Sequence, residues 1–366
     1  MKILITGSNG FIAKNLIKHL KRDEEIQVYL FNKNDSLTIL EAYVKEVDFI
    51  YHLAGVNRPK NSSEFYEGNV DLTKYLIDIL RKLKKKIPII FSSSTQAILY
   101  NDYGKSKLAA EKIILNYSKE FQVKCYIYRL PNVFGKWCKP NYNSVIATWC
   151  YNISHNINVE ISDSSYKMNL VYIDDVVNSF FKCLSNEEAG YITIPIIYNK
   201  TLGEIKELLF SFKENRSSLV IPTVSSGFER VLYATYLSYL DINDFSYKLN
   251  GHKDDRGTFY EILKTQDSGQ FSLSTTKAGI TRGNHYHNTK NEKFLVVKGK
   301  AKIEFRHIFT DETITYEVSD KLIEIVEMIP GYTHNITNIG SEELLLILWA
   351  NEQFDVNNPD TYFLKV

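Results

Sequence analysis

The chain has 366 residues, of which 44% are hydrophobic and 24% charged, and this is the composition of a globular protein rather than a disordered one. Its formal net charge of +1 at pH 7 gives no reason to expect a nucleic acid or an acidic membrane surface as partner. No stretch approaches the roughly 18 apolar residues of a membrane span, so we expect no membrane insertion. The length favours two domains.

The first half alternates short β-rich runs with helical patterns, which is typical of an α/β Rossmann fold with a doubly wound parallel sheet. We predict strands at residues 2–6, 27–31, 48–53, 88–92 and 123–130, and helices at 11–22, 36–46, 72–86 and 102–120. After about residue 245 short alternating strands take over, as in an all-β barrel or sandwich. We predict strands there at residues 259–264, 270–275, 292–297, 301–306, 324–328 and 344–349. The expected domains are 1–248 and 249–366.

Two features of the sequence favour a cytoplasmic location. The apolar stretch before the Thr6-Gly7 turn is only three residues long, too short for the core of a signal peptide. The four cysteines form no CxxC pair, which argues against a four-thiolate zinc site. We therefore expect reduced thiols in a cytoplasmic protein.

A glycine-rich turn follows the first predicted strand and opens a helix, with the sequence Thr6-Gly7-Ser8-Asn9-Gly10-Phe11-Ile12-Ala13. Gly7 permits a tight turn, and Gly10 lets the backbone approach a pyrophosphate at the positive end of the helix. The small side chain of Ala13 allows close packing of helix on strand. The placement predicts a dinucleotide site.

The second predicted strand ends without the acid that usually binds the ribose 2′-hydroxyl of NAD. Asn32 and Lys33 stand there instead and suit a 2′-phosphate, so we predict NADPH as the cofactor. The alternative is that Lys33 is an ordinary solvated lysine.

Tyr103 and Lys107 are spaced i, i+4 and so share one face of a predicted helix. A phenol with a pKa of ~10 is a poor acid catalyst at neutral pH, and a nearby ammonium group is expected to lower that pKa. Tyr103 can then donate its proton to a carbonyl oxygen while hydride reaches the carbon. A hydroxyl of the preceding run, Ser92-Ser93-Ser94, can bind the same oxygen.

With these motifs, the N-terminal half resembles the extended short-chain dehydrogenases/reductases, the class that acts on nucleotide sugars. Further support comes from His52-Leu53-Ala54-Gly55, Gly68-Asn69-Val70 and the stretches 129–135 and 172–176. The resemblance implies that Ser94 is catalytic with Tyr103 and Lys107, and that Asn132 binds the sugar nucleotide, unless it only caps a loop. The expected cofactor-binding residues are Gly7, Asn9, Gly10, Phe11, Ile12, Asn32, Lys33, Leu53, Ala54, Gly55, Tyr103 and Lys107.

The last third holds four candidate metal ligands, His285, His287, Glu292 and His334. Alternation along a strand puts His285 and His287 on one face, with Glu292 beginning the next strand and His334 on a third. Three imidazoles and a carboxylate suit zinc, iron, manganese or nickel. The spacing resembles the two motifs of cupins, all-β jelly-roll barrels, although Pro330-Gly331 are adjacent where the family has Pro-x-Gly.

Two arginine-glycine stretches, around Arg256 and Arg282, resemble those of cupin-fold nucleotide-sugar 3,5-epimerases, where they hold the substrate's phosphates. In those enzymes the histidine that matches His285 is the base and no metal is bound. As a metal ligand, His285 is a poor base, so the identity of a base stays open. The candidates are Tyr286, Lys293, Lys302, His307 and Tyr332.

Over its whole length the chain resembles bifunctional capsular-polysaccharide enzymes, with the likeness strongest at residues 134–143, 291–297 and 358–363. That family epimerises C3 of a UDP-2-acetamido-2,6-dideoxy-4-hexulose and then reduces the C4 ketone with NADPH to UDP-2-acetamido-2,6-dideoxy-L-talose. The resemblance implies zinc in the cupin and a homodimer or higher oligomer. Epimerisation must come first, because reduction removes the carbonyl that acidifies the hydrogen on C3.

Three other functions stay open. The cupin can be a structural or dimerising module on a plain reductase. It can also bind iron and perform oxygen chemistry. Finally, the Rossmann half can be a sugar-nucleotide sensor without activity, which an intact pair of Tyr103 and Lys107 argues against.

Overall fold

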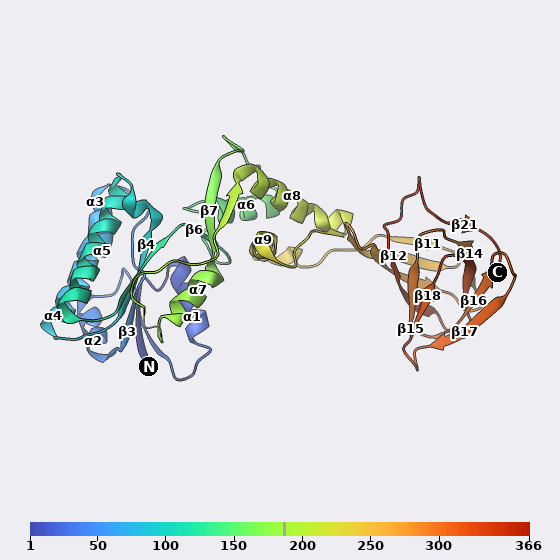
Figure 1. Cartoon of the computed structure of the whole chain (residues 1–366), viewed down its shortest axis with the longest axis horizontal. Helices are drawn as coiled ribbons and strands as arrows, with labels where there is room; N and C mark the ends of the chain where they lie inside the picture. Colours follow the sequence, from blue (N-terminus) through green and yellow to red (C-terminus); the bar gives the residue numbers. More distant parts are fainter. Residues whose placement is uncertain (186–187) are drawn as a thin grey trace. The chain divides into compact units, whose positions relative to one another are not determined.

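The computed structural model describes residues 1–185 and 188–366. The chain forms two compact units (Figure 1). The first unit comprises residues 1–210 and 225–241, and the second comprises residues 211–224 and 242–366. Residues 211–224 thus belong to the second unit, although they precede the predicted boundary at residue 248.

The first unit is built on a six-stranded parallel sheet with the strand order β2-β1-β3-β4-β5-β8. These strands are β1 (Lys2–Thr6), β2 (Gln27–Phe31), β3 (Phe49–His52), β4 (Ile89–Ser94), β5 (Cys125–Leu130) and β8 (Gly190–Tyr191). The order reverses between β1 and β3, and at such a switch point the loops after the two strands diverge and leave room for a ligand. The predicted Rossmann fold is confirmed.

Helices cover both faces of this sheet, as the alternation of side chains along β1 requires. Ile3 and Ile5 face a core that contains residues of α1 (Phe11–Leu20) and α7 (Ile173–Lys182). Leu4 faces the opposite core. The helices of that second face are α2 (Leu37–Glu46), α4 (Leu72–Lys82) and α5 (Asp102–Phe121).

Smaller elements extend the first unit beyond the carboxyl edge of the sheet. A short sheet joins β6 (Asn132–Phe134), β7 (Lys167–Tyr172) and β9 (Tyr198–Thr201). The accompanying helices are α3 (Ser63–Tyr66), α6 (Val145–Ser154) and α9 (Gly227–Leu237), while α8 (Leu202–Ser218) begins in the first unit and ends in the second. No helix among residues 1–185 and 188–366 is long and apolar enough to cross a membrane.

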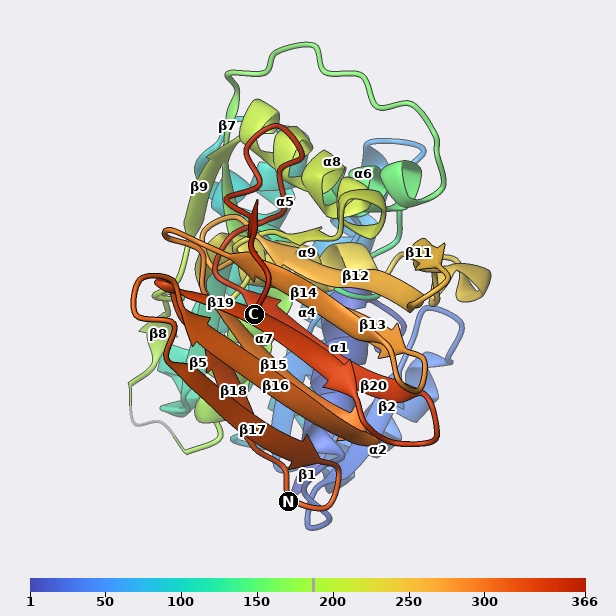
Figure 2. The ribbon, with the colours of Figure 1, turned by 90° about the vertical axis from the view of Figure 1, so that its right-hand side faces the viewer.

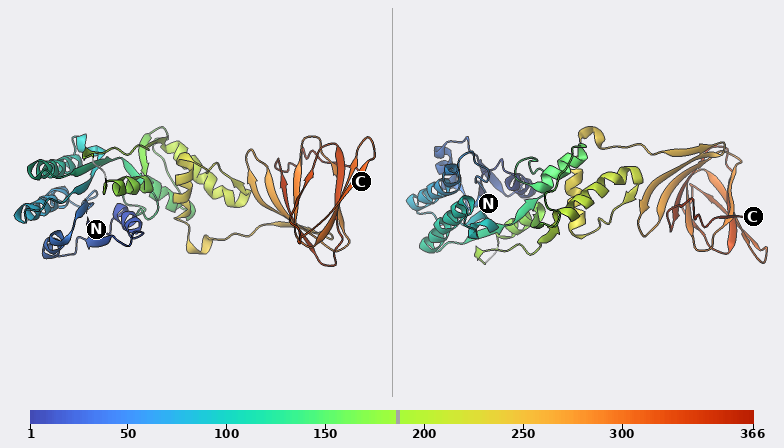
Figure 3. Two further views of the ribbon diagram at one scale, coloured as in Figure 1. Left: turned by 60° about the horizontal axis from the view of Figure 1, so that its bottom comes forward. Right: turned by 90° about the horizontal axis from the view of Figure 1, so that it is seen from above.

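The second unit consists of two sheets, seen from two sides in Figure 3 and face-on in Figure 2. One sheet has the order β10-β12-β13-β20-β15-β18 with β11 beside β12, and the other the order β17-β16-β19-β14-β21. The first holds β10 (Val220–Ile221), β11 (Gly251–Asp254), β12 (Gly257–Thr265), β13 (Gln270–Thr276), β15 (Glu292–Lys298), β18 (Ile325–Met328) and β20 (Leu344–Ala350). The second holds β14 (Thr281–Tyr286), β16 (Lys300–His307), β17 (Thr313–Ser319), β19 (Tyr332–Asn338) and β21 (Tyr362–Phe363).

An apolar core lies between the two sheets, and it includes Phe294 and Val296 from one sheet and Ile303 and Ile336 from the other. All pairings are antiparallel except that of β10 with β12. This architecture confirms the predicted all-β cupin domain.

Candidate functional site

The glycine-rich turn lies at the switch point of the parallel sheet. Gly7 has a φ of +68°, and a Cβ at this position would lie 2.7 Å from Cα of Ala54, in the loop after β3. The amide of Gly10 donates to the carbonyl of Gly7 at 2.8 Å, and no side chain caps the start of α1. The turn therefore packs directly on the Leu53–Gly55 loop and leaves the first amides of α1 for a ligand.

Of the two residues that follow β2, Asn32 binds the glycine turn and Lys33 is exposed to solvent. The Asn32 carbonyl oxygen accepts hydrogen bonds from the Asn9 amide at 2.9 Å and from the Ser8 hydroxyl at 2.8 Å, so Asn32 braces the glycine turn. Asp35 accepts the Asn32 amide at 2.7 Å. Lys33 is exposed and makes no side-chain hydrogen bond or ion pair within the described part of the chain. The Lys33 ammonium is thus available for a ligand's phosphate, whereas Asn32 is held against the glycine turn through its side-chain oxygen.

The loop after β3 joins the glycine turn to the predicted catalytic lysine. A Cβ on Gly55 would lie 3.0 Å from Nζ of Lys107 and 2.8 Å from Oδ1 of Asn69. Asn69 in turn binds the Val56 backbone and donates to the Ser106 hydroxyl at 2.9 Å. Predicted cofactor and catalytic residues therefore meet in one place.

The end of β4 is matched to one face of α5. The Ser92 carbonyl accepts a hydrogen bond from Lys107 at 2.9 Å, and the Ser93 hydroxyl donates to Glu111 at 2.5 Å. The Ser94 side chain is hydrogen-bonded to Tyr103. Successive residues of the strand thus bind residues spaced i, i+4 and i+8 on the helix, which brings the predicted Ser94, Tyr103 and Lys107 together.

The start of α5 is fixed by the close packing of its first turn against the segment that contains Gln96. The Asn101 side chain accepts the Gly104 amide at 2.7 Å and caps α5. A Cβ on Gly104 would lie 2.2 Å from the Gln96 carbonyl oxygen, so only glycine fits between Tyr103 and Lys105. The start of α5, and with it Tyr103, is thereby positioned against the segment that follows Ser94.

The pKa values at this site depend chiefly on burial. Lys107 is 5% exposed, and burial lowers its pKa to about 8, while the negative charge of Glu111 acts in the opposite direction. Burial raises the pKa of Tyr103, and the hydrogen bond with Ser94 opposes this. The expected lowering of the Tyr103 pKa by Lys107 is therefore wrong for this arrangement. The lysine ammonium is engaged by the Ser92 carbonyl instead.

Sequence reasoning missed Glu111, the fully buried carboxylate at the base of this site. Besides the Ser93 hydroxyl, it binds the Arg129 guanidinium at 2.6 Å and the Tyr191 hydroxyl at 2.9 Å. Although burial raises the pKa of Glu111, these donors lower it overall, so the group stays ionised. An acid four residues after Lys107 on the buried helix face was the available signal.

Asn132, the predicted substrate residue of the first unit, is exposed on β6. Its amide donates to the Asn169 carbonyl on β7 at 3.3 Å. Within residues 1–185 and 188–366, no hydrogen bond joins Asn132 to Tyr103.

In the second unit, the four predicted metal ligands converge. The ligand atoms of His285, His287, Glu292 and His334 all lie within 4.8 Å of one another. His285 and His334 are direct neighbours on β14 and β19, and Glu292 begins β15 as expected. β14 ends at Tyr286, so His287 starts the following loop instead of sharing the strand.

The state of these side chains fits a divalent metal. His287 and His334 are buried, and Nε2 of each has no hydrogen-bond partner within the described residues. Nδ1 of His287 lies 2.6 Å from the Asp360 carbonyl oxygen and so carries the proton, which leaves Nε2 as an electron-pair donor. Burial lowers the pKa of His285 to about 4, so it is neutral at pH 7.

Glu292 supplies the negative charge of this cluster. Its carboxylate lies 3.5 Å from Nε2 of His287 and 3.6 Å from Nε2 of His334. Although burial raises the pKa of Glu292, the two histidines hold it well below its usual range. Three imidazoles and one carboxylate are a donor set for zinc or a similar ion.

The two predicted substrate arginines of the second unit meet at one acid. Asp254 accepts Arg256 at 2.6 Å and Arg282 at 3.4 Å, and chiefly the Arg256 hydrogen bond lowers its pKa to about 2. Arg282 also donates to the Thr275 carbonyl, while its buried Nε has no partner among the described residues. The two guanidinium groups therefore keep N–H donors that Asp254 does not use.

Three of the five candidate bases have other partners. His307 accepts the backbone amides of Phe309 and Thr310, which ties it to a turn. Lys293 and Lys302 form ion pairs with acids, Glu327 and Glu304 respectively. Tyr286 and Tyr332 make only ring contacts, with Tyr362 and with His307 and Phe305. The identity of a base stays open between these side chains.

Replacement of Glu111 by alanine is expected to destabilise the first unit by about 3–5 kcal/mol, because it leaves a buried ion pair without its acid. Thermal unfolding followed by calorimetry measures the change. Glu120→Ala is the matched control, because Glu120 lies on the same helix but pairs with Arg81 at the surface. Such exposed pairs contribute about 0–1 kcal/mol. An equal effect of both variants would contradict the role given to Glu111.

Comparison with known proteins agrees with both units. The model of the NAD dependent epimerase/dehydratase family matches residues 3–199, and that of the polysaccharide biosynthesis C-terminal domain matches residues 252–362. The chain is 46% identical over 368 residues to UDP-2-acetamido-2,6-beta-L-arabino-hexul-4-ose reductase of Pseudomonas aeruginosa, covering 100% of this chain and 99% of that protein.

Solved structures give the same result. The capsular polysaccharide assembling protein CapF of Staphylococcus aureus is 47% identical and superposes with a TM-score of 0.93 over 100% of both chains. UDP-glucuronic acid 4-epimerase of Bacillus cereus, at 18% identity, shares the fold over 65% of this chain with a TM-score of 0.57. The chain therefore belongs to the NAD dependent epimerase/dehydratase family and, over its whole length, to the CapF-like capsular polysaccharide proteins.

Proposed function

We propose that this protein is a bifunctional nucleotide-sugar enzyme. It epimerises C3 of UDP-2-acetamido-2,6-dideoxy-4-hexulose in the cupin and then reduces the C4 ketone to UDP-2-acetamido-2,6-dideoxy-L-talose. The single observation that carries the reductase half is the convergence of Ser94, Tyr103 and Lys107 beside the glycine turn. The relative from Pseudomonas aeruginosa is named as a reductase of such a UDP-linked hexulose, which supports the substrate class.

The reduction needs a proton donor at the ketone oxygen, and Tyr103 supplies it. Its raised pKa keeps the phenol protonated at neutral pH, and Ser94 orients the hydroxyl group. Lys107, with a pKa of about 8, remains mostly an ammonium at pH 7, and its position between the Ser92 carbonyl and Gly55 assigns it to binding the cofactor. NADPH supplies the hydride when it is bound by the glycine turn, Leu53, Ala54 and Gly55.

Epimerisation removes the C3 proton while the C4 carbonyl is still present. We assign the substrate's phosphates in this step to Arg256 and Arg282, whose guanidinium groups gather around Asp254. The four metal-ligand candidates suit zinc, which supplies Lewis-acid stabilisation of negative charge on oxygen when it is bound. Neutral His285 and ionised Glu292 already have the protonation states that a metal requires.

A reductase whose cupin is only structural is the second candidate. The name of the Pseudomonas aeruginosa relative mentions reduction alone, and this favours it. Exchange of the C3 hydrogen with solvent separates the two functions, because a plain reductase has no means to remove that hydrogen.

Incubation of the UDP-4-keto-hexulose in D2O, followed by NMR, tests both halves together. Deuterium is expected at C3 without NADPH, and reduction is expected only when NADPH is added. Tyr103→Phe should slow reduction by about 10²–10⁴-fold, because the phenolic proton is lost, and leave deuterium exchange intact. Tyr100→Phe is the control, since Tyr100 is 93% exposed. Wild-type protein that reduces the sugar without exchange would favour the plain reductase.

Replacement of Lys33 by alanine tests the cofactor. We expect KM for NADPH to rise about tenfold, equivalent to ~1.4 kcal/mol, because the 2′-phosphate loses its charge partner. Kinetics with NADH, which has no 2′-phosphate, should stay unchanged and serve as the control. Equal effects on both cofactors would contradict a role for Lys33 in selecting NADPH.

Metal analysis of the purified protein tests the ligand cluster. We expect about one zinc ion per chain, removable by a strong chelator. His334→Ala should abolish stoichiometric binding, because it removes one of the four donors, whereas His252→Ala should retain it, since His252 is exposed on β11. Zinc retained by the His334→Ala protein at wild-type affinity would rule this cluster out.

A further inference from the structure

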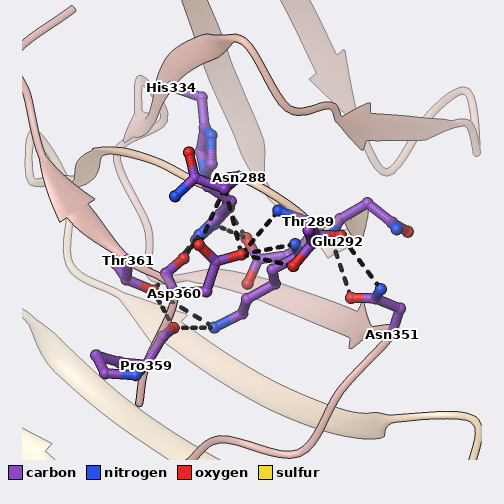
Figure 4. A network of polar contacts seen from close by, with 11 residues as sticks. Asn288, Thr289, Glu292, His334, Asn351, Pro359, Asp360 and Thr361 are labelled. Carbon is purple, nitrogen blue, oxygen red and sulfur yellow. Dashed lines mark hydrogen bonds and ion pairs between the residues drawn. The ribbon is translucent and has the colours of Figure 1, made fainter.

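The C-terminal segment, residues 359–366, lies across the loop that joins two of the metal-ligand candidates (Figure 4). That loop, residues 288–291, runs from His287 to Glu292. The Asp360 carboxylate accepts hydrogen bonds from three successive amides, those of Asn288 at 3.1 Å and of Thr289 and Lys290 at 2.8 Å each. A segment more than 70 residues away in sequence thereby fixes the loop's shape.

Apart from Asp360, Asn351 also forms hydrogen bonds with the backbone of the loop. Asn351 accepts the Asn291 amide at 3.1 Å and donates to the Thr289 carbonyl at 3.4 Å, at the far end of the loop. The Thr289 hydroxyl adds a fourth hydrogen bond to Asp360, at 3.1 Å. Burial raises the pKa of the Asp360 carboxyl, but the amides of the loop hold it far below its usual range. The carboxylate is therefore charged when it binds the loop.

The same residue also orients a ligand through its backbone. The Asp360 carbonyl oxygen lies 2.6 Å from Nδ1 of His287, and it holds the proton on that nitrogen and leaves Nε2 toward Glu292. The backbone of Asp360 has a φ of +39°, where few side chains other than asparagine and aspartate are found. This conformation lets the carbonyl reach His287 while the carboxylate reaches the loop.

The neighbours of Asp360 anchor it on both sides. Before it, the Pro359 carbonyl accepts the buried Lys290 ammonium at 3.4 Å. After it, β21 pairs with β14, so that Phe363 lies opposite His285. The Leu364 carbonyl also accepts a hydrogen bond from the Thr333 hydroxyl, next to His334 on β19. The C-terminal segment therefore touches the strand or loop of all four ligands.

We propose that Asp360 is a positioning residue of the metal centre. Its carboxylate shapes the loop between His287 and Glu292, and its carbonyl selects the ring nitrogen of His287 that faces the metal. This inference rests on the metal centre proposed above, but not on the reductase site. Loss of such an outer partner typically weakens metal affinity by about 10–100-fold.

Competition with a chelating indicator measures zinc affinity on the full-length protein. Asp360→Ala is expected to weaken zinc binding by about 10–100-fold, because the loop amides lose their acceptor. Asp360→Asn keeps one acceptor oxygen and the backbone preference, and should lose less. Asp355→Ala is the matched control from the same chain end, because the Asp355 side chain is exposed and binds only the nearby Asn357 amide, at 2.9 Å. We expect it to bind zinc like the wild type.

Each result decides the proposal. Wild-type affinity in Asp360→Ala, or an equal loss in Asp355→Ala, would overturn it. If Asp360→Ala does not fold, as judged by circular dichroism, Asp360→Asn takes its place, and wild-type affinity there would overturn it as well. A wild-type protein without affinity for zinc would overturn this inference and the metal centre together. NADPH-dependent ketone reduction, measured on the same samples, reports on the reductase proposal separately.

Discussion

The burial of one ammonium group, that of Lys107, constrains the first unit more than any other interaction. A charged amine removed from water needs acceptors and a counter-charge nearby. The Ser92 carbonyl and Glu111 provide them, and Gly55 leaves the necessary space. Because these groups come from β4, α5 and the loop after β3, the sheet, the helix and the cofactor loop must assemble together for the lysine to be accommodated.

That constraint links the stability of the unit to its chemistry. Glu111 joins α5 to β4, β5 and β8 through Ser93, Arg129 and Tyr191. The same carboxylate opposes the loss of the Lys107 charge. A buried ion pair seldom contributes much net stability by itself, but removal of one partner is costly. The arrangement therefore keeps the lysine charged in a place where burial alone would favour the neutral amine.

Whereas the first unit buries a cation, the second unit buries a set of electron-pair donors, the four metal-ligand candidates. Within residues 1–185 and 188–366, Nε2 of His287 and Nε2 of His334 have no hydrogen-bond partner, and both lie near Glu292. This state is unfavourable unless a cation is shared among them. Elsewhere in the same unit, Asp254 and Asp360 are stabilised by guanidinium groups and by backbone amides. The unit thus gives Asp254 and Asp360 hydrogen-bond donors, while the buried metal-ligand candidates converge on one point.

Local sequence determined the elements and the chemical groups of this protein. Strands predicted at 27–31 and 270–275 are found at Gln27–Phe31 and Gln270–Thr276, and the Rossmann and cupin folds are confirmed. The strands β14, β17 and β19 were not predicted, because polar residues and the bulge between Gly283 and His285 interrupt their alternation. The alternation of apolar and polar residues reveals a strand only where one of its faces is consistently apolar.

Tertiary structure alone decided how these groups act on one another. The pairing of β10 with β12, the burial of Glu111 beside Lys107, and the reach of Asp360 to the ligand loop all join residues without a shared local pattern. The direction of the Tyr103 pKa shift also depends on tertiary structure, because burial of the phenol outweighs any effect of its helical spacing from Lys107. Spacing along a chain specifies which residues share a face, but the chain's folding specifies what that face meets.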